Sequence, residues 1–141
     1  MTNGVAGGIN IVLRALLNPG DEVIIFRPYY PAYKGFVENW QGKIVEVNPK
    51  EDFQPDFEDL EHKITIRTKV VIVNSPHNPT GVIYTKETAA KISEILKSKQ
   101  KEYGHAICLL SDEPYRDLCV YRREIAMVAG FLPEYNCIIF I

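Results

Sequence analysis

The chain alternates short, continuously apolar runs with longer segments in which apolar residues recur every three or four positions. The continuous runs are rich in valine and isoleucine. They lie at Val23–Phe26, Ile44–Val47, Val70–Val73, Ala106–Leu110 and Cys137–Ile141, the second of them interrupted by Glu46. Continuous runs of this length and composition predict strands that are covered on both faces, as in a parallel sheet.

Three of the intervening segments carry an apolar stripe at helical spacing. The stripes consist of Val5, Ile9, Val12, Leu13 and Leu16; of Tyr33, Phe36, Val37 and Trp40; and of Ala89, Ile92, Ile95, Leu96 and Tyr103. Thr2 or Asn3 can cap the first helix, Thr85 can open the third, and Gly104 follows its end. Strands that alternate with helices predict the α/β class, with three layers: a mostly parallel sheet and helices on both faces.

Length and charge narrow the range of partners. A chain of 141 residues is long enough for one domain with a core and too short for two. Its formal net charge of −2 is spread evenly, so no basic stripe is available to bind nucleic acid. No apolar run reaches the length of a membrane span, and the N-terminus lacks a secretory signal pattern, so we expect a cytoplasmic protein without a membrane partner.

The cysteines and histidines predict neither a disulfide framework nor a metal site. Cys108, Cys119 and Cys137 are odd in number and show no paired spacing, and the three histidines show no metal-ligand spacing. We expect reduced thiols and no bound metal.

A rigid loop follows the buried run that ends at Val73. It reads Asn74-Ser75-Pro76-His77-Asn78-Pro79-Thr80-Gly81. Two prolines and a glycine within a few residues force a non-helical loop at a strand end and fix the direction of the Asn78 amide. Taken alone, the loop is also compatible with an ordinary turn.

A carboxylate follows the buried run that ends at Leu110, in the segment Ser111-Asp112-Glu113-Pro114-Tyr115. A carboxylate at the end of a central strand is costly unless a cation or a hydrogen-bond donor meets it. Asp112 could equally cap the following segment, so this motif alone leaves its role open.

Four spans together resemble a known family. They are Pro19-Gly20-Asp21, the Pro-Tyr-Tyr-Pro-Ala-Tyr stretch at 28–33, Asn78-Pro79-Thr80-Gly81 and Asp112-Glu113-Pro114-Tyr115. Their order and spacing resemble those of class I and II aminotransferases, fold-type-I enzymes of the aspartate aminotransferase superfamily that use pyridoxal 5′-phosphate (PLP). The resemblance covers the chain from Thr2 to Ile141 and implies the PLP-binding large domain.

The resemblance assigns a cofactor-binding role to four side chains and one helix start. Asp112 matches the carboxylate that pairs with the protonated ring nitrogen, and Asn78 and Tyr115 match the groups that hold the 3′-oxygen. Tyr30 matches the aromatic residue that stacks on the ring, although a core position is the alternative for it. The start of the first helix, Asn3-Gly4-Val5, matches the turn that binds the phosphate through backbone N–H groups.

The lysine that forms the Schiff base in this family lies beyond the strand-end aspartate, and this sequence has no lysine after Lys101. The resemblance therefore implies that residues 1–141 are a partial large domain without a catalytic residue of their own. The N-terminal arm, the lysine segment and the small C-terminal domain would lie outside the chain, and the full-length protein would be a homodimer.

The implied function is transfer of an amino group between an amino acid and a 2-oxo acid. Three alternatives stay open at this point. A carbon–sulfur lyase or decarboxylase uses the same ring contacts. A non-catalytic aminotransferase-like regulatory domain would also carry the motifs. An unrelated doubly wound domain could match by accident, in which case Asn78 and Asp112 would not converge on one pocket.

Overall fold

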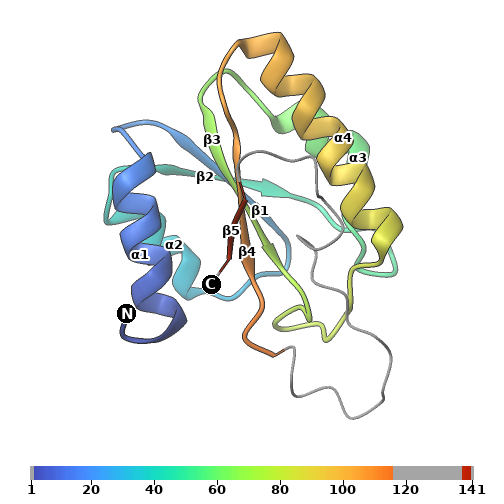
Figure 1. The fold of residues 1–141 in the computed structure, drawn as a ribbon. Helices are drawn as coiled ribbons and strands as arrows, with labels where there is room; N and C mark the ends of the chain where they lie inside the picture. Colours follow the sequence, from blue (N-terminus) through green and yellow to red (C-terminus); the bar gives the residue numbers. More distant parts are fainter. Residues whose placement is uncertain (1, 116–137, 141) are drawn as a thin grey trace.

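A computed structural model describes residues 2–115 and 138–140 of the chain (Figure 1). The helices and strands alternate along most of it. In chain order they are α1 (Gly4–Leu16), β1 (Glu22–Phe26), α2 (Ala32–Glu38), β2 (Lys43–Val47), α3 (Phe57–Lys63), β3 (Thr68–Asn74), α4 (Lys86–Tyr103), β4 (Cys108–Asp112) and β5 (Ile138–Phe140).

The described strands form one sheet in the order β2-β1-β3-β4-β5, and every neighbouring pair is parallel. Each apolar run in the sequence overlaps one of these strands, so the predicted α/β class with a parallel sheet is confirmed. All five residues of β1 and of β4 are buried, as expected for central strands that are covered on both faces.

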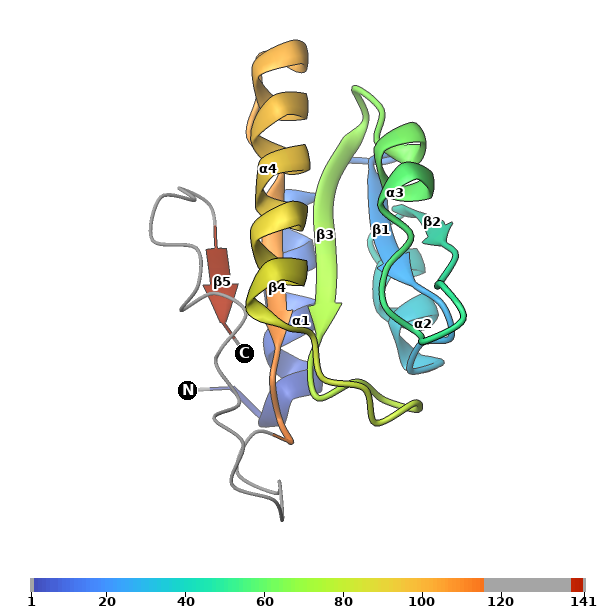
Figure 2. The same ribbon diagram turned by 90° about the vertical axis from the view of Figure 1, so that its right-hand side faces the viewer.

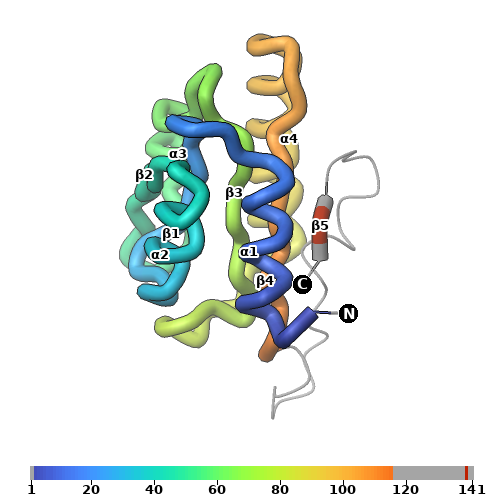
Figure 3. Tube along the Cα trace, turned by 90° about the vertical axis from the view of Figure 1, so that its left-hand side faces the viewer, coloured from blue at the N-terminus to red at the C-terminus, as the bar shows by residue number. Residues whose placement is uncertain are grey.

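Helices cover both faces of the sheet and make three layers. α1 and α2 lie on one face, towards the viewer in Figure 3, and α3 and α4 lie on the other, towards the viewer in Figure 2. Side chains of β1 alternate between them: Val23 and Ile25 pack with α1 and α2, whereas Ile24 and Phe26 pack with α3 and α4. The core is therefore divided into two apolar clusters by the sheet.

The helix caps in the structure match the predicted ones in part. The Thr85 hydroxyl accepts from the Thr88 N–H at the start of α4, and Gly104 ends that helix with φ of 72°. Asn3 is at the N-cap position of α1, but its side chain makes no capping hydrogen bond. α3, a helix of seven residues with Asp56 as its cap, was not predicted, because only Phe57 and Leu60 of its residues are apolar and two residues make no stripe.

The topology brings the two loop motifs together. β3 and β4 are neighbours, and their last residues, Asn74 and Asp112, are paired in register. Parallel strands end at the same edge of a sheet, so the loops that follow them start side by side.

The expectations about cysteines, membrane spans and metal sites can be compared with the structure only for the described residues. Cys108 is a buried cysteine of β4, whereas Cys119 and Cys137 lie outside the described residues. Within residues 2–115 and 138–140, every helix is too short or too polar to span a bilayer. In the same part of the chain, no three residues of metal-binding type gather into a site.

We predict that Gly42→Ala destabilises the chain. A Cβ atom there would meet Leu17 Cδ1 and Val37 Cγ1 at 2.9 Å and the Val37 carbonyl oxygen at 3.3 Å, at the end of α2. Overpacking of this kind costs about 1–3 kcal/mol, measured as the free energy of unfolding in urea.

Gly35→Ala is the matched control, because Gly35 lies in α2 and a Cβ atom added there would meet no atom within 4 Å. Alanine is favoured over glycine inside a helix by up to about 1 kcal/mol, so this variant should be as stable as the parent or slightly more stable. Equal unfolding free energies for the two variants would contradict the close packing at Gly42.

Candidate functional site

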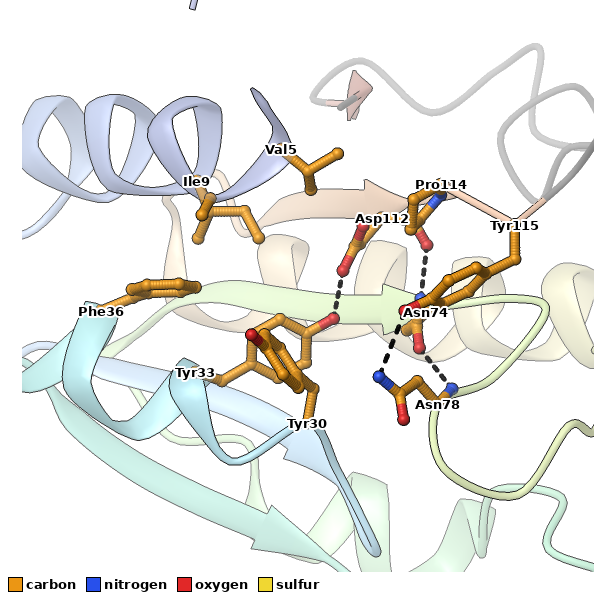
Figure 4. Close-up of a pocket in the computed structure, with 11 residues that line it drawn as sticks. Val5, Ile9, Tyr30, Tyr33, Phe36, Asn74, Asn78, Asp112, Pro114 and Tyr115 are labelled. Atoms are coloured by element: carbon orange, nitrogen blue, oxygen red, sulfur yellow. Dashed lines mark hydrogen bonds between the residues drawn. The ribbon is translucent and has the colours of Figure 1, made fainter. Parts of the chain in front are cut away.

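A cavity of about 200 Å³ lies at the carboxyl ends of β3 and β4, beneath the start of α1 and beside α2 (Figure 4). It combines an apolar wall with a cluster of polar groups at the strand ends. Its lining residues come from α1 (Val5, Ala6, Ile9), from α2 and the turn before it (Tyr30, Tyr33, Phe36) and from the ends of β3 and β4 and the loops that follow them (Asn74, Asn78, Asp112, Pro114, Tyr115).

Asp112, the last residue of β4, is the most deeply buried charged group of the cavity, with 5% of its surface exposed. The Tyr33 hydroxyl donates a hydrogen bond to its Oδ2 atom, drawn as a dashed line in Figure 4. Its Oδ1 atom is buried and has no hydrogen-bond partner in the described structure. One carboxylate oxygen is thus held in place, and the other has no donor.

The surroundings of Asp112 disfavour its charged form. Burial raises the pKa of the carboxyl above its ordinary value, the nearby Glu113 charge raises it further, and the bond from Tyr33 acts in the opposite direction. The pKa of Tyr33 is also raised, first by burial and then by the Asp112 charge. The Tyr33 hydroxyl therefore remains protonated and acts as the donor. A cation or donor that reached Oδ1 would offset the cost of the buried charge.

Asn78 and Tyr115 converge from the two strand-end loops. The Asn78 side-chain amide donates to the Tyr115 hydroxyl at 3.3 Å. Asn78 is half-buried, and Tyr115 is 38% exposed. Both side chains and Asp112 line one cavity, which contradicts the alternative of an accidental match with an unrelated fold.

Tyr30 lies at the mouth of the cavity, with 43% of its surface exposed. Its ring packs edge-on against Tyr33, with the ring centroids 5.8 Å apart and the planes at 86°. A large aromatic side chain that is exposed at a cavity mouth is available to pack against a ligand.

Of the three residues predicted at the start of α1, only Val5 lines this cavity; Asn3 and Gly4 lie at the helix end beyond it. The Asn3 side chain does not cap the helix, and the first turn has no acidic residue. The first N–H groups of α1 therefore point out of the helix without a side-chain acceptor, and the helix end favours an anion.

Two polar residues of the cavity, Tyr33 and Asn74, were not predicted as site residues. Tyr33 is a core aromatic residue, as expected, but its hydroxyl also bonds Asp112. A signal existed, because Tyr33 belongs to the same Pro-Tyr-Tyr-Pro-Ala-Tyr stretch as Tyr30. Asn74 lies at the start of the first motif and lines the cavity. No lysine lies among the lining residues.

We predict that Tyr33→Phe lowers stability most at neutral pH. The variant leaves both oxygens of a buried carboxylate without a donor, which costs about 1–3 kcal/mol of unfolding free energy. Because the folded-state pKa of Asp112 is raised above 3.8, the free-energy penalty for burying its charge is absent below pH 3.8, grows as the pH rises from there to the folded-state pKa, and is constant above it. Urea unfolding at about pH 7.5 and about pH 4.5 measures the difference.

Asp112→Asn serves as the control background, since it removes the charge and keeps an oxygen that accepts from Tyr33. In this background Tyr33→Phe should lower the unfolding free energy by less than it does in the parent, and the loss should be the same at both pH values. An identical loss at both pH values in the parent would show that Tyr33 does not stabilise a charged carboxylate.

Comparisons with known proteins agree with this geometry. The sequence pattern of the family described as aminotransferase class I and II matches residues 1–140. The aspartate/prephenate aminotransferase of Thermus thermophilus is 39% identical over 127 residues, which are 89% of this chain and 31% of that protein. A probable kynurenine–oxoglutarate transaminase of Saccharomyces cerevisiae is 36% identical over 146 residues, covering 95% of this chain and 31% of that protein.

A crystal structure of an aminotransferase from Eubacterium rectale superposes with a TM-score of 0.92 at 39% identity, covering 99% of this chain and 35% of that one. The chain spans about a third of the length of the relatives that it matches. On the family match, the identity and the shared fold, the chain belongs to the class I and II aminotransferases.

Proposed function

We propose that the chain forms the ring-binding side of a PLP-dependent aminotransferase that transfers an amino group between an amino acid and a 2-oxo acid. The observation that carries the proposal is the buried Asp112 Oδ1 atom, which has no partner at the floor of a cavity. The relatives support the reaction type, because those quoted above are named aminotransferases or transaminases.

The groups around the cavity fit the pyridine ring of PLP. A protonated ring nitrogen is a flat cationic donor, and Oδ1 of Asp112 is the acceptor that lacks a partner. The ion pair would favour both the protonated ring and the charged carboxylate, which burial alone disfavours. Tyr33 would hold the second carboxylate oxygen and so fix the plane of the pair.

The remaining side chains fit the other parts of the cofactor. Asn78 and Tyr115 carry N–H and O–H groups close together at the strand ends, where they would donate to the 3′-oxygen of the ring. Tyr30 at the mouth would pack against the ring face. The start of α1, with Asn3, Gly4 and Val5, would bind the phosphate through its open N–H groups.

When bound, PLP supplies an electron sink for the substrate carbon at which a bond to hydrogen is broken. The chain's own residues would make that sink effective. Asp112 would keep a proton on the ring nitrogen, and Tyr30 would hold the tilt of the ring. α1 and α2 would exclude water from the floor of the site, where Asp112 is 5% exposed.

This cavity does not supply the lysine that an aminotransferase needs to bind PLP covalently. None lines it, and the sequence carries none after Lys101. We therefore place the reactive lysine outside these residues, so that the chain by itself would bind the cofactor without completing the transfer. As a partial large domain, it would need the lysine-bearing part of the enzyme.

A segment exchange tests the proposal. The matching residues of the Thermus thermophilus enzyme would be replaced by this chain, and transfer from L-aspartate to 2-oxoglutarate would be measured with saturating PLP. We expect the chimera to transfer the amino group. Asp112→Asn within the chimera should lower kcat/KM by about a hundredfold or more, because the ring loses its charge partner.

Asp21→Asn is a matched control of the same chemical change. Asp21 accepts from Asn18 in a surface turn that does not line the cavity, so kcat/KM should stay near that of the chimera. A folded chimera that binds PLP but transfers no amino group would contradict the proposal. Equal rates for the chimera and its Asp112→Asn variant would do so as well.

A further inference from the structure

Asn74 joins the two strand-end loops through its side chain. Its Nδ2 donates to the main-chain oxygen of Asp112 at 2.8 Å. Its Oδ1 accepts from the main-chain N–H of Asn78 at 2.7 Å. Both bonds are drawn in Figure 4, where the Asn74 side chain lies between the Asp112 end of β4 and the Asn78 loop. One amide thus bonds the main chains of two residues that line the cavity.

The position and chemistry of Asn74 suit this bridge. It is the last residue of β3, is paired in register with Asp112 and is 5% exposed. An asparagine amide offers an acceptor and a donor on opposite sides of one planar group. Aspartate offers only acceptors and leucine offers neither, so asparagine is the residue of this length that can satisfy both main chains.

The loop beyond Asn74 depends on such a bridge. Pro76 and Pro79 have no N–H group, so these two residues cannot donate a main-chain hydrogen bond. At its far end the loop is held by the bond from His77 N–H to the Val82 oxygen at 2.8 Å. The Asn78 main chain itself is held by Asn74.

We propose that Asn74 is a positioning residue, whose amide fixes the placement of the Asn78 side chain relative to the Asp112 carboxylate. The inference deepens the proposed function, because the two fixed groups are those that would meet opposite sides of the cofactor ring. Asn74 acts through main-chain atoms of Asn78 and Asp112, so its role is to set the distance between the side chains of these two residues.

The test measures hydrogen exchange of single amides by NMR and binding of pyridoxine 5′-phosphate by calorimetry. This compound keeps the ring, the 3-hydroxyl and the phosphate but has no aldehyde, so it forms no imine with surface lysines. In Asn74→Leu the Asn78 amide should exchange at least about tenfold faster, and binding should weaken by about five- to tenfold, because one buried hydrogen bond to each loop is lost.

Asn74→Asp separates the two halves of the bridge. Its carboxylate still accepts from the Asn78 N–H but no longer donates to the Asp112 oxygen. We therefore expect Asn78 to stay protected while ligand binding weakens. This variant also decides the question if the leucine variant does not fold, since fast exchange at Asn78 in Asn74→Asp would overturn the inference.

Two controls distinguish a specific effect on Asn78 from a general loss of structure in the loop. The His77 amide, which bonds Val82, should keep its exchange rate in both variants. Ser75→Ala removes a different bond of the same loop, the one from Tyr84 N–H to the Ser75 hydroxyl at 3.0 Å, and should leave Asn78 protected.

The outcomes for Asn74 and for the cofactor are distinguishable. Unchanged Asn78 exchange in Asn74→Leu overturns the bridge, and faster exchange with unchanged binding overturns its importance for the ligand. If the parent chain does not bind pyridoxine 5′-phosphate, the proposed cofactor site fails, while the exchange rates still decide whether Asn74 holds the loop.

Discussion

A buried carboxylate with one oxygen bonded and one without a partner is the constraint around which this structure is built. Asp112 lies at the end of a central strand, with α1 and α2 covering it on one side. A folded chain ordinarily avoids such a group, because burial of an incompletely paired charge costs stability. Its presence at the floor of a cavity is what the binding of a flat cationic ring would explain.

The fold supplies the geometry for this group from parts that are far apart in the sequence. The parallel register of β3 and β4 places Asn74 opposite Asp112, and α2 delivers Tyr33 to the carboxylate. The first motif loop then returns Asn78 towards Tyr115 on the second. The rigid part of the site is thus carried by the sheet and α2, and the loops add the donors.

Much of this arrangement could be predicted from the sequence. Continuous apolar runs located each strand, and the third helical stripe lies between two caps that the structure contains, Thr85 and Gly104. The convergence of Asn78 and Asp112 followed from parallel strands that end at one edge. These features depend on local pattern and on general rules of sheet topology.

The contacts that depend on tertiary packing could not be predicted in this way. Periodicity shows that Tyr33 is buried, but it does not show which group its hydroxyl meets. In the same way, the composition of the first loop gives no sign that Asn74 bonds two main chains at once. Capping propensity placed Asn3 at the right position of α1, yet its side chain makes no capping bond. In each case the partner comes from a distant segment or from a local choice among several bonds.

The charge pairing at Asp112 can be measured directly on bound pyridoxine 5′-phosphate labelled with nitrogen-15 in the ring. The NMR shift of that nitrogen reports whether it carries a proton. If Asp112 is its partner, the ring nitrogen stays protonated at pH values where the free compound has lost its proton, and Asp112→Asn abolishes the difference. A bound ring that loses its proton at the same pH as the free compound would contradict the account.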